Sequence, residues 1–212
     1  MPNWCSSTIY FYTKEKNVIE EFKNKVEEIY NGTATVKNGF GSGWLGDYVN
    51  TLLDPEYHAD TEKGPRCRGS LELYDELAIE EQGEYWCFHI YTETAWYPMI
   101  KMWQMILDKH YPQIKIAFRA EESGDDIYVR HDPENLFFEF DNFFVLYDIG
   151  DYGSHCFDSL GDVLDHIIGI KELGLTGGEF EGKTAKEIAE IASEKAWLMI
   201  HEFEHVELNE VD

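Results

Sequence analysis

Two histidines near the end of the sequence have the spacing of zinc ligands. His201-Glu202-x-x-His205 fits the H-E-x-x-H pattern of zinc hydrolases, and with Glu204 the same stretch fits the inverted H-x-x-E-H pattern. Histidines four residues apart share one face of a helix, so they can hold one zinc ion there. A catalytic zinc site also needs a third protein ligand, and only seven residues follow His205.

The helix expected around these histidines turns them away from its apolar face. We expect this helix over residues 184–206. Its apolar stripe consists of Ala185, Ile188, Ala192, Ala196, Met199, Phe203 and Val206. His201 and His205 each lie two residues past a stripe position, about 200° round the helix, and so we expect them to face solvent. We therefore predict no metal and no cofactor, and we keep a zinc-dependent hydrolase as an alternative.

Three other patterns offer chemistry, but their surroundings argue against it. The stretch GSGWLG at 41–46 satisfies G-x-G-x-x-G, yet it follows an expected helix, whereas the dinucleotide fingerprint follows a strand. The carboxylate groups at 121–126 and 148–153 lack the alternating spacing of a calcium loop. Cys87 and His89 share a strand face, but acidic surroundings raise the pKa of a thiol. We interpret these as a glycine loop, solvated turns and sheet packing, and we expect no enzyme.

Negative charge is the strongest compositional feature of the chain. The sequence has 42 Asp and Glu residues against 17 Lys and Arg residues, for a net charge of −25. Residues 131–212 alone hold 20 acidic and 4 basic side chains. Such a field repels nucleic acid and anionic membranes, and it attracts basic partners. A generic solubilising surface is the alternative interpretation.

Carboxylates in this acidic segment are the candidate binding residues. Glu187, Glu190 and Glu194 succeed one another at helical spacing, which places them about 4.5–6 Å apart along a helix axis. A nucleic-acid strand presents one charge per about 3.4 Å. We predict that a line of carboxylates occupies a basic groove that normally holds a phosphate backbone. The full candidate set is Asp148, Asp151, Asp158, Asp162, Asp165, Glu187, Glu190 and Glu194.

The elements that position these residues follow from hydrophobic periodicity. The first half has strand patterns at 7–13, 68–79, 84–94 and 114–123, and helix patterns at about 18–30 and 99–111. This β-α-β-β-α-β order predicts an α+β fold with a ferredoxin-like antiparallel sheet. A glycine-rich loop over 31–65 holds at most one short helix, near 45–53.

Further strands and two helices are expected after residue 126. The stretches 126–132 and 135–150 suggest strands, with Asp141-Asn142 as a turn inside the second. Asp158 or Ser159 caps a helix to about residue 173, and Thr184 begins the last helix. We therefore predict a ferredoxin-like domain over 1–130 and an acidic extension of strands and two helices over 131–212, packed on or beside it.

Simple sequence features suggest a cytoplasmic protein. The four cysteines are scattered and form no C-x-x-C pair, so we expect reduced thiols. Charges interrupt every apolar stretch well before about 18 residues, so we expect no contact with a membrane. The N-terminus lacks the pattern of a secretory signal. The sequence leaves the oligomeric state open.

Three short motifs resemble one family. MPNWC at 1–5, TAWYP at 94–98 and FRAEESGDDIYV at 118–129 are similar to motifs of the ferredoxin-like family of phage and plasmid proteins typified by YubB. The resemblance covers about residues 1–130 and implies a ferredoxin-like fold carried on mobile elements, without an assigned reaction. Such proteins usually place Asn two residues after the cysteine, where this chain has Ser7.

Charge and resemblance together predict a function of binding. We expect a non-enzymatic, phage or mobile-element protein that docks its acidic half onto a basic nucleic-acid-binding host protein and inhibits it as a nucleic-acid mimic. A defence nuclease, such as a CRISPR effector or a restriction enzyme, is the expected class of partner, and no direct contact with nucleic acid is expected. The alternative is an accessory mobile-element protein that makes protein contacts and whose charge only solubilises it.

Overall fold

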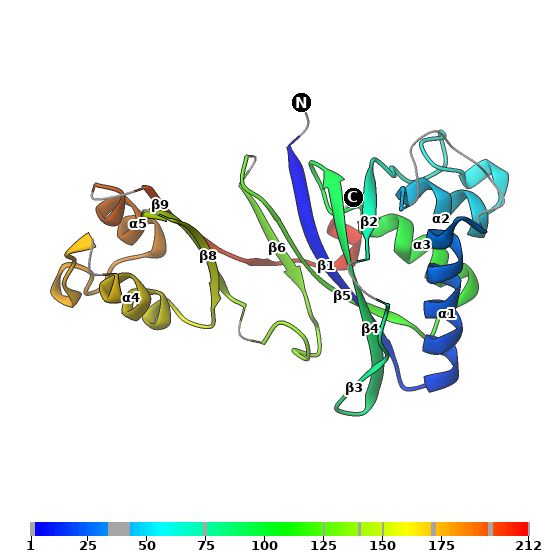
Figure 1. The fold of residues 1–212 in the computed structure, drawn as a ribbon, viewed down its shortest axis with the longest axis horizontal. Coiled ribbons are helices and arrows are strands. Elements are labelled where there is room, and N and C mark those ends of the chain that lie inside the picture. Colours follow the sequence, from blue (N-terminus) through cyan, green and yellow to red (C-terminus); the bar gives the residue numbers. More distant parts are fainter. Residues whose placement is uncertain are drawn as a thin grey trace. The chain divides into compact units, whose positions relative to one another are not determined.

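The structure, a computed structural model, forms two compact units along the chain (Figure 1). Unit 1 consists of Met1–Phe137 and His205–Asp212, and unit 2 of Phe138–Glu204. The described residues are 3–33, 43–73, 76–124, 126–139, 141–149, 151–170, 173–194 and 197–211. The fold class is α+β, as predicted, and none of the helices in these ranges is long and apolar enough to cross a membrane.

Unit 1 is built on a seven-stranded sheet. Its strands lie in the order β10-β6-β5-β1-β4-β2, with β3 paired to β4. They are β1 (Trp4–Thr13), β2 (Gly69–Glu72), β3 (Glu80–Gln82), β4 (Tyr85–Ala95), β5 (Lys115–Glu122), β6 (Ile127–His131) and β10 (Glu204–His205). The helices are α1 (Lys16–Glu28), α2 (Leu45–Leu52) and α3 (Ile100–His110), with short turns at Ile29–Thr33, Pro55–Tyr57 and Leu208–Glu210. The short helix expected near 45–53 is thus confirmed.

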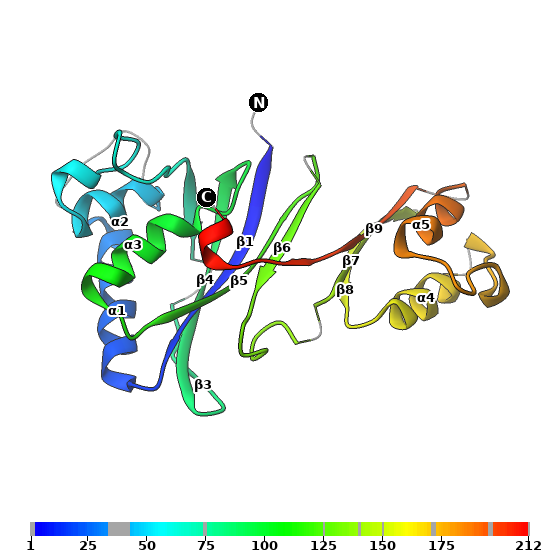
Figure 2. The same cartoon turned by 180° about the vertical axis from the view of Figure 1, so that it is seen from behind.

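Strand β1 lies at the centre of this sheet, and its side chains alternate between the two faces of the sheet. It runs antiparallel to both β4 and β5. Ile9 and Phe11 are fully buried and contact the residues of α1 and α3 in the core. Figure 2 shows from behind that α1 and α3 lie on one face of this sheet. Phe22 on α1 and Trp103 on α3 pack against this face, because both helices have one apolar stripe. The alternate side chains of β1, such as those of Ser6 and Thr8, point to the opposite face.

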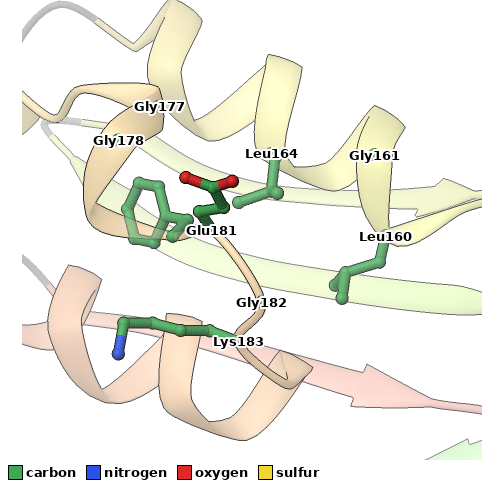
Figure 3. Close-up of a pocket in the computed structure, with 9 residues that line it drawn as sticks. Leu160, Gly161, Leu164, Gly177, Gly178, Glu181, Gly182 and Lys183 are labelled. Carbon is green, nitrogen blue, oxygen red and sulfur yellow. The ribbon is translucent and has the colours of Figure 1, made fainter.

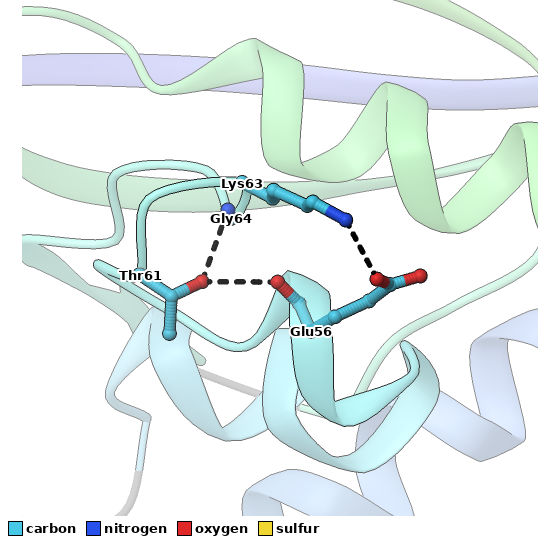
Figure 4. A network of polar contacts seen from close by, with 4 residues as sticks. All are labelled: Glu56, Thr61, Lys63 and Gly64. Atoms are coloured by element: carbon cyan, nitrogen blue, oxygen red, sulfur yellow. Dashed lines mark hydrogen bonds and ion pairs between the residues drawn. The ribbon is translucent and has the colours of Figure 1, made fainter.

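The loop after α2 is held by its own polar groups (Figure 4). The Thr61 hydroxyl donates to the Glu56 carbonyl at 3.3 Å and accepts from the Gly64 amide at 3.1 Å. Lys63 forms an ion pair with the Glu56 carboxylate at 2.8 Å. These bonds give a fixed course to a segment with few apolar residues.

The end of the chain returns to unit 1. The Val206 amide donates to the Arg130 carbonyl at 3.0 Å, and the His131 ring nitrogen Nδ1 lies 2.8 Å from the Val206 carbonyl. Val211 is buried in the core of unit 1. Residues 205–212 therefore complete the first unit and are no part of the acidic second one.

Unit 2 is a three-stranded sheet with two helices on one face (Figure 1). The sheet order is β8-β7-β9, and β7 runs antiparallel to both neighbours. The elements are β7 (Phe143–Ile149), β8 (Asp151–Phe157), α4 (Leu160–Gly169), a 3-10 turn (Gly177–Glu179), α5 (Ala185–Ser193) and β9 (Trp197–Glu202). Val145, Val163 and Ile188 form its core with Leu198 and Ile200.

The prediction of one helix over 184–206 was wrong after Ser193. Residues Trp197–Glu202 form strand β9, in which Leu198 and Ile200 are buried two positions apart. The stretch pairs with β7 along its full length, and this pairing is between residues distant in sequence. The Ser193 hydroxyl bonds to both the Ala189 and the Leu198 carbonyls, at 2.6 and 2.8 Å, and so joins the helix end to the strand.

The turn expected at Asp141-Asn142 is confirmed only at Asp141, whose backbone amide donates to the Phe138 carbonyl at 3.1 Å. The Asn142 amide donates to the Phe157 carbonyl, and the Asn142 carbonyl accepts from the Phe203 amide, at 3.0 and 2.9 Å. This residue therefore joins the start of β7 to its two neighbours instead of turning a hairpin. Strand β7 instead pairs antiparallel with β8, up to Ile149 opposite Asp151.

Candidate functional site

The eight carboxylates predicted to bind a partner all lie in unit 2. Asp148 is on β7, Asp151 begins β8, Asp158 precedes α4, and Glu194 follows α5. The remaining four lie on the two helices: Asp162, Asp165, Glu187 and Glu190. All of them are exposed except Asp151, whose side chain is outside the description. Unit 2 holds 15 acidic and 4 basic residues, a net charge of −11.

Two of these carboxylates cap helices. At α4, the Asp162 carboxylate accepts from the Ser159 amide at 3.2 Å, while the Ser159 hydroxyl accepts from the Asp162 amide. At α5, the Glu187 carboxylate accepts from the Thr184 amide at 2.8 Å in the same arrangement. The Thr184 amide, with its hydroxyl, lowers the pKa of Glu187. Both groups therefore stabilise their helices, because anions are favoured at a helix N-terminus.

A third carboxylate also has a partner inside unit 2. The side-chain nitrogen Nδ2 of Asn142 donates to the Asp158 backbone carbonyl at 2.8 Å and to the Asp158 carboxylate at 2.9 Å. These bonds connect the start of β7 to the residue before α4. Asp158 thus helps to define the fold.

Of the five remaining carboxylates, the four whose side chains are described are oriented towards solvent. Asp165 lies two residues from both Val163 and Ile167, the buried residues of α4, and therefore about 200° round the helix from them. Glu190 has the same relation to the buried residues of α5. The side-chain carboxylates of Asp148, Asp165, Glu190 and Glu194 make no hydrogen bond or ion pair with any residue in the described ranges.

Unit 1 contrasts with this arrangement because many of its acids are paired. Lys14 lies 2.6 Å from Glu84, and Lys109 lies 3.0 Å from Asp54. Exposed pairs of this kind contribute little to stability, but they do neutralise charge locally. The four solvent-oriented carboxylates of unit 2, which we call the docking carboxylates, have no such basic partner among the described residues.

The HEFEH stretch does not form the helical zinc motif. His201 lies on β9 opposite Phe144, and His205 lies on β10, where its Nε2 accepts from the Arg130 Nε at 3.0 Å. In an extended strand, residues four apart are separated by about 13 Å, so the two imidazoles do not share a helix face. Within the described ranges, no three His, Cys, Asp or Glu side chains are grouped to hold a metal ion.

Cys87 and His89 share a face of β4, as predicted, but the thiol is not activated. Burial, followed by the charge of Glu80, raises the pKa of Cys87 to about 11. The thiol is therefore protonated near neutral pH and is a poor nucleophile. The His89 ring instead lies 3.2 Å from the Tyr91 hydroxyl.

The remaining motifs are only partly described. Residues 41 and 42 of the glycine stretch lie outside the described ranges, and Leu45 already belongs to α2. The carboxylate group 121–126 covers the end of β5 and the turn to β6, with Asp125 undescribed. The group 148–153 covers the hairpin between β7 and β8.

No match to this chain was found among protein-family models, curated proteins or solved structures. The function must therefore be argued from the chain's own residues.

One pattern that the sequence predictions did not use lies beside α5. Residues 177–184 read G-x-x-x-x-G-K-T, the spacing of phosphate-binding loops. The loop lines a cavity of about 550 Å³ together with Leu160 and Leu164 (Figure 3). A phosphate-binding loop follows a strand and leads into a helix. Its unpaired backbone amides and the N-terminus of that helix bind the anion.

The surroundings of this loop do not suit a phosphate. Its first three residues, Gly177–Glu179, form a 3-10 turn, and the described residues 173–176 before it are not a strand. The Lys183 amide donates to the Phe180 carbonyl at 3.1 Å, and the Thr184 amide donates to the Glu187 carboxylate. The Glu181 carboxylate lines the cavity beside Leu164, as Figure 3 shows. We therefore assign this loop a structural role at the start of α5.

A cluster of two histidines joins α4 to the sheet of unit 2. The rings of His155 and His166 lie 4.9 Å apart, and the His155 Nε2 lies 3.1 Å from the Tyr147 hydroxyl. Burial, and then the neighbouring His155, lower the pKa of His166. The cluster depends on the packing of α4 on β7 and β8, which the sequence alone did not indicate.

Proposed function

We propose that this protein is a non-enzymatic binding protein that docks onto a basic nucleic-acid-binding protein and competes with nucleic acid for it. The observation that carries the proposal is the set of docking carboxylates, Asp148, Asp165, Glu190 and Glu194, which are exposed and unpaired within the described ranges. They lie on a unit with a net charge of −11.

The physical argument is one of electrostatic cost and complementarity. Like charges concentrated on a small unit repel one another and destabilise the folded state. A partner with a basic groove removes this cost when it binds, and it gains a fast, steered association. Because the charges of both partners are screened by salt, the complex must weaken as ionic strength rises.

We further propose that unit 1 is a ferredoxin-like domain of the mobile-element type. The antiparallel order β5-β1-β4-β2, with α1 and α3 on one face, supports this assignment. The resemblance of MPNWC, TAWYP and FRAEESGDDIYV to phage and plasmid proteins supports it independently. A host defence nuclease is the class of partner that such an element has reason to inhibit.

A capture experiment with matched variants tests the binding function. The full chain is immobilised, exposed to bacterial lysate at low salt and eluted with steps of increasing salt. One variant carries Asp148→Asn, Asp165→Asn, Glu190→Gln and Glu194→Gln. The control variant removes four exposed carboxylates of unit 1 by Glu62→Gln, Glu76→Gln, Glu81→Gln and Asp108→Asn.

The two interpretations of the charge give different results. Docking predicts that a basic nucleic-acid-binding protein is retained by the wild type and the control, elutes early, and is lost with the unit 2 variant. A purely solubilising charge is favoured by the fact that Asp158, Asp162 and Glu187 already have partners inside unit 2. That alternative predicts no retained protein, or one indifferent to salt and to both variants.

A further inference from the structure

The face of the unit 1 sheet opposite α1 and α3 contains a polar depression. Register places Glu93 of β4 and Glu121 of β5 on either side of Ser6. In the same way, Tyr91 and Arg119 lie on either side of Thr8, and Glu72 of β2 lies opposite Tyr91. Because side chains alternate along strands, all these groups point to the same face.

The depression has the size and charge for one cationic side chain. Its volume is about 180 Å³. This is below the range of roughly 300–1,000 Å³ found for small-molecule sites, and so it suits a single side chain. The depression is lined by three carboxylates, Glu72, Glu93 and Glu121, and by one guanidinium, that of Arg119. Negative groups therefore outnumber positive ones in it.

Exposed aromatic rings flank the depression. Tyr91 is 42% exposed and Trp4 is 53% exposed. Trp4 lies two residues before Ser6 on β1, which places it on the same face at a distance of about 7 Å along the strand. Such rings attract lysine and arginine side chains through the negative face of the π-system. The depression thus combines carboxylates with one aromatic wall, Tyr91, and Trp4 is a second exposed ring on the same face.

Neighbouring contacts hold these groups in place. The Ser6 hydroxyl donates to the Glu93 carboxylate at 2.5 Å, and His89 contacts the Tyr91 hydroxyl at 3.2 Å. At the end of β4, the Arg68 guanidinium already lies 4.9 Å from the centre of the exposed Trp96 ring. Another exposed ring of unit 1 thus already holds a guanidinium group of the protein itself.

We propose that this open sheet face docks a basic segment of a partner protein, with one arginine or lysine side chain in the depression between Tyr91 and Glu93. Charge complementarity selects this occupant, because a net charge of −25 repels a second copy of the chain and anionic ligands. The inference goes beyond the function proposed above, since it uses none of the docking carboxylates of unit 2.

The test uses defined probes and the full chain. Acetyl-Gly-Arg-Gly-amide is titrated into ¹⁵N-labelled protein, and chemical shifts are followed by NMR. The matched probe replaces arginine with citrulline, which has nearly the same shape but no charge. We expect saturable shifts at the amides of Ser6, Thr8, Glu93 and Arg119 with the arginine peptide, and at least fivefold weaker binding of the citrulline peptide.

Variants separate the depression from general acidity. Glu93→Gln with Glu121→Gln is expected to weaken binding at least fivefold, whereas Glu62→Gln with Asp108→Asn, on the other side of unit 1, leaves it unchanged. Tyr91→Leu, at a largely exposed ring, is expected to weaken binding at least twofold even if the carboxylate variant fails to fold.

Three results would overturn the inference. They are equal binding of both peptides, shifts scattered over acidic surfaces of both units, and tighter binding of spermine than of the arginine peptide. The unit 2 variant with all four docking carboxylates neutralised is expected to bind the peptide normally. Loss of peptide binding in that variant would also contradict the inference, while capture of a basic partner tests the proposed function separately.

Discussion

Truncation of one core side chain in unit 2 is expected to destabilise that unit strongly while the stability of unit 1 is unchanged. Ile188 on α5 is fully buried among Val145, Val163 and Leu198. An isoleucine-to-alanine change in such a position costs about 2–5 kcal/mol, from lost burial and from the cavity that remains.

The size of unit 2 makes this loss severe. Unit 2 spans Phe138–Glu204, and at about 0.05–0.15 kcal/mol per residue its free energy of unfolding is roughly 3–10 kcal/mol. Ile188→Ala therefore removes a large part of that free energy. The two units have separate cores, one around Phe11, Phe22 and Trp103 and the other around Val145 and Ile188, so the effect should stay local.

Hydrogen exchange measured by mass spectrometry reads both units in one sample. We expect Ile188→Ala to speed exchange in β7, β9 and α5 by the factor that the lost free energy implies, at least tenfold, with no change in β1, β4 and β5. Ile9→Ala, in the other core, is the matched variant and should give the opposite pattern. Equal acceleration in both units after Ile188→Ala would refute the reasoning that the cores are independent.

Other predictions follow from individual contacts. Thr184→Ala and Ser159→Ala each remove an N-cap and should lower the free energy of unfolding of unit 2 by about 1 kcal/mol in urea titrations. The lowered pKa of His166 means that the unfolded chain takes up a proton first as pH falls through about 6.5. The stability of unit 2 should therefore be complete above that pH and fall below it, and His166→Gln should flatten this dependence; an unchanged slope would contradict the assignment. Because burial raises the pKa of Cys87 to about 11, iodoacetamide at pH 8 should label the less buried Cys156 first and Cys87 only after unfolding, as peptide mapping can check.

Local patterns predicted most of the helices and the central strands. The apolar spacing of Ile19, Phe22 and Val26 marked α1, and the β-branched and aromatic residues of 7–13 marked β1. The start of α5 was predicted from Thr184, because a threonine three residues before Glu187 is a local capping signal. Each of these signals is contained in a few neighbouring residues.

The errors concern pairing between distant segments. Met199, Phe203 and Val206 have helical spacing, but Leu198 and Ile200 are the residues that face the core of unit 2. Pairing with β7 decides between the two patterns, and a sequence window around residue 200 holds no information on β7. The return of residues 205–212 to unit 1 was missed for the same reason.

For the candidate sites too, the sequence indicated local composition but not the contacts that depend on the fold. Charge counting located the acidic unit, but it did not separate the capping carboxylate of Asp162 from the exposed one of Asp165. The depression on unit 1 was not predicted, because Glu72, Glu93 and Glu121 belong to three different strands whose register is known only from the fold.

Competition with nucleic acid tests the proposed function most directly. The partner captured at low salt is bound to labelled duplex DNA or RNA, and this protein is added in increasing amounts while the bound fraction is measured by fluorescence anisotropy. Our account predicts that the wild type displaces the nucleic acid at near-stoichiometric amounts at low salt, and that the variant of Asp148, Asp165, Glu190 and Glu194 does not. A ternary complex of partner, nucleic acid and this protein, or equal displacement by wild type and variant, would contradict it.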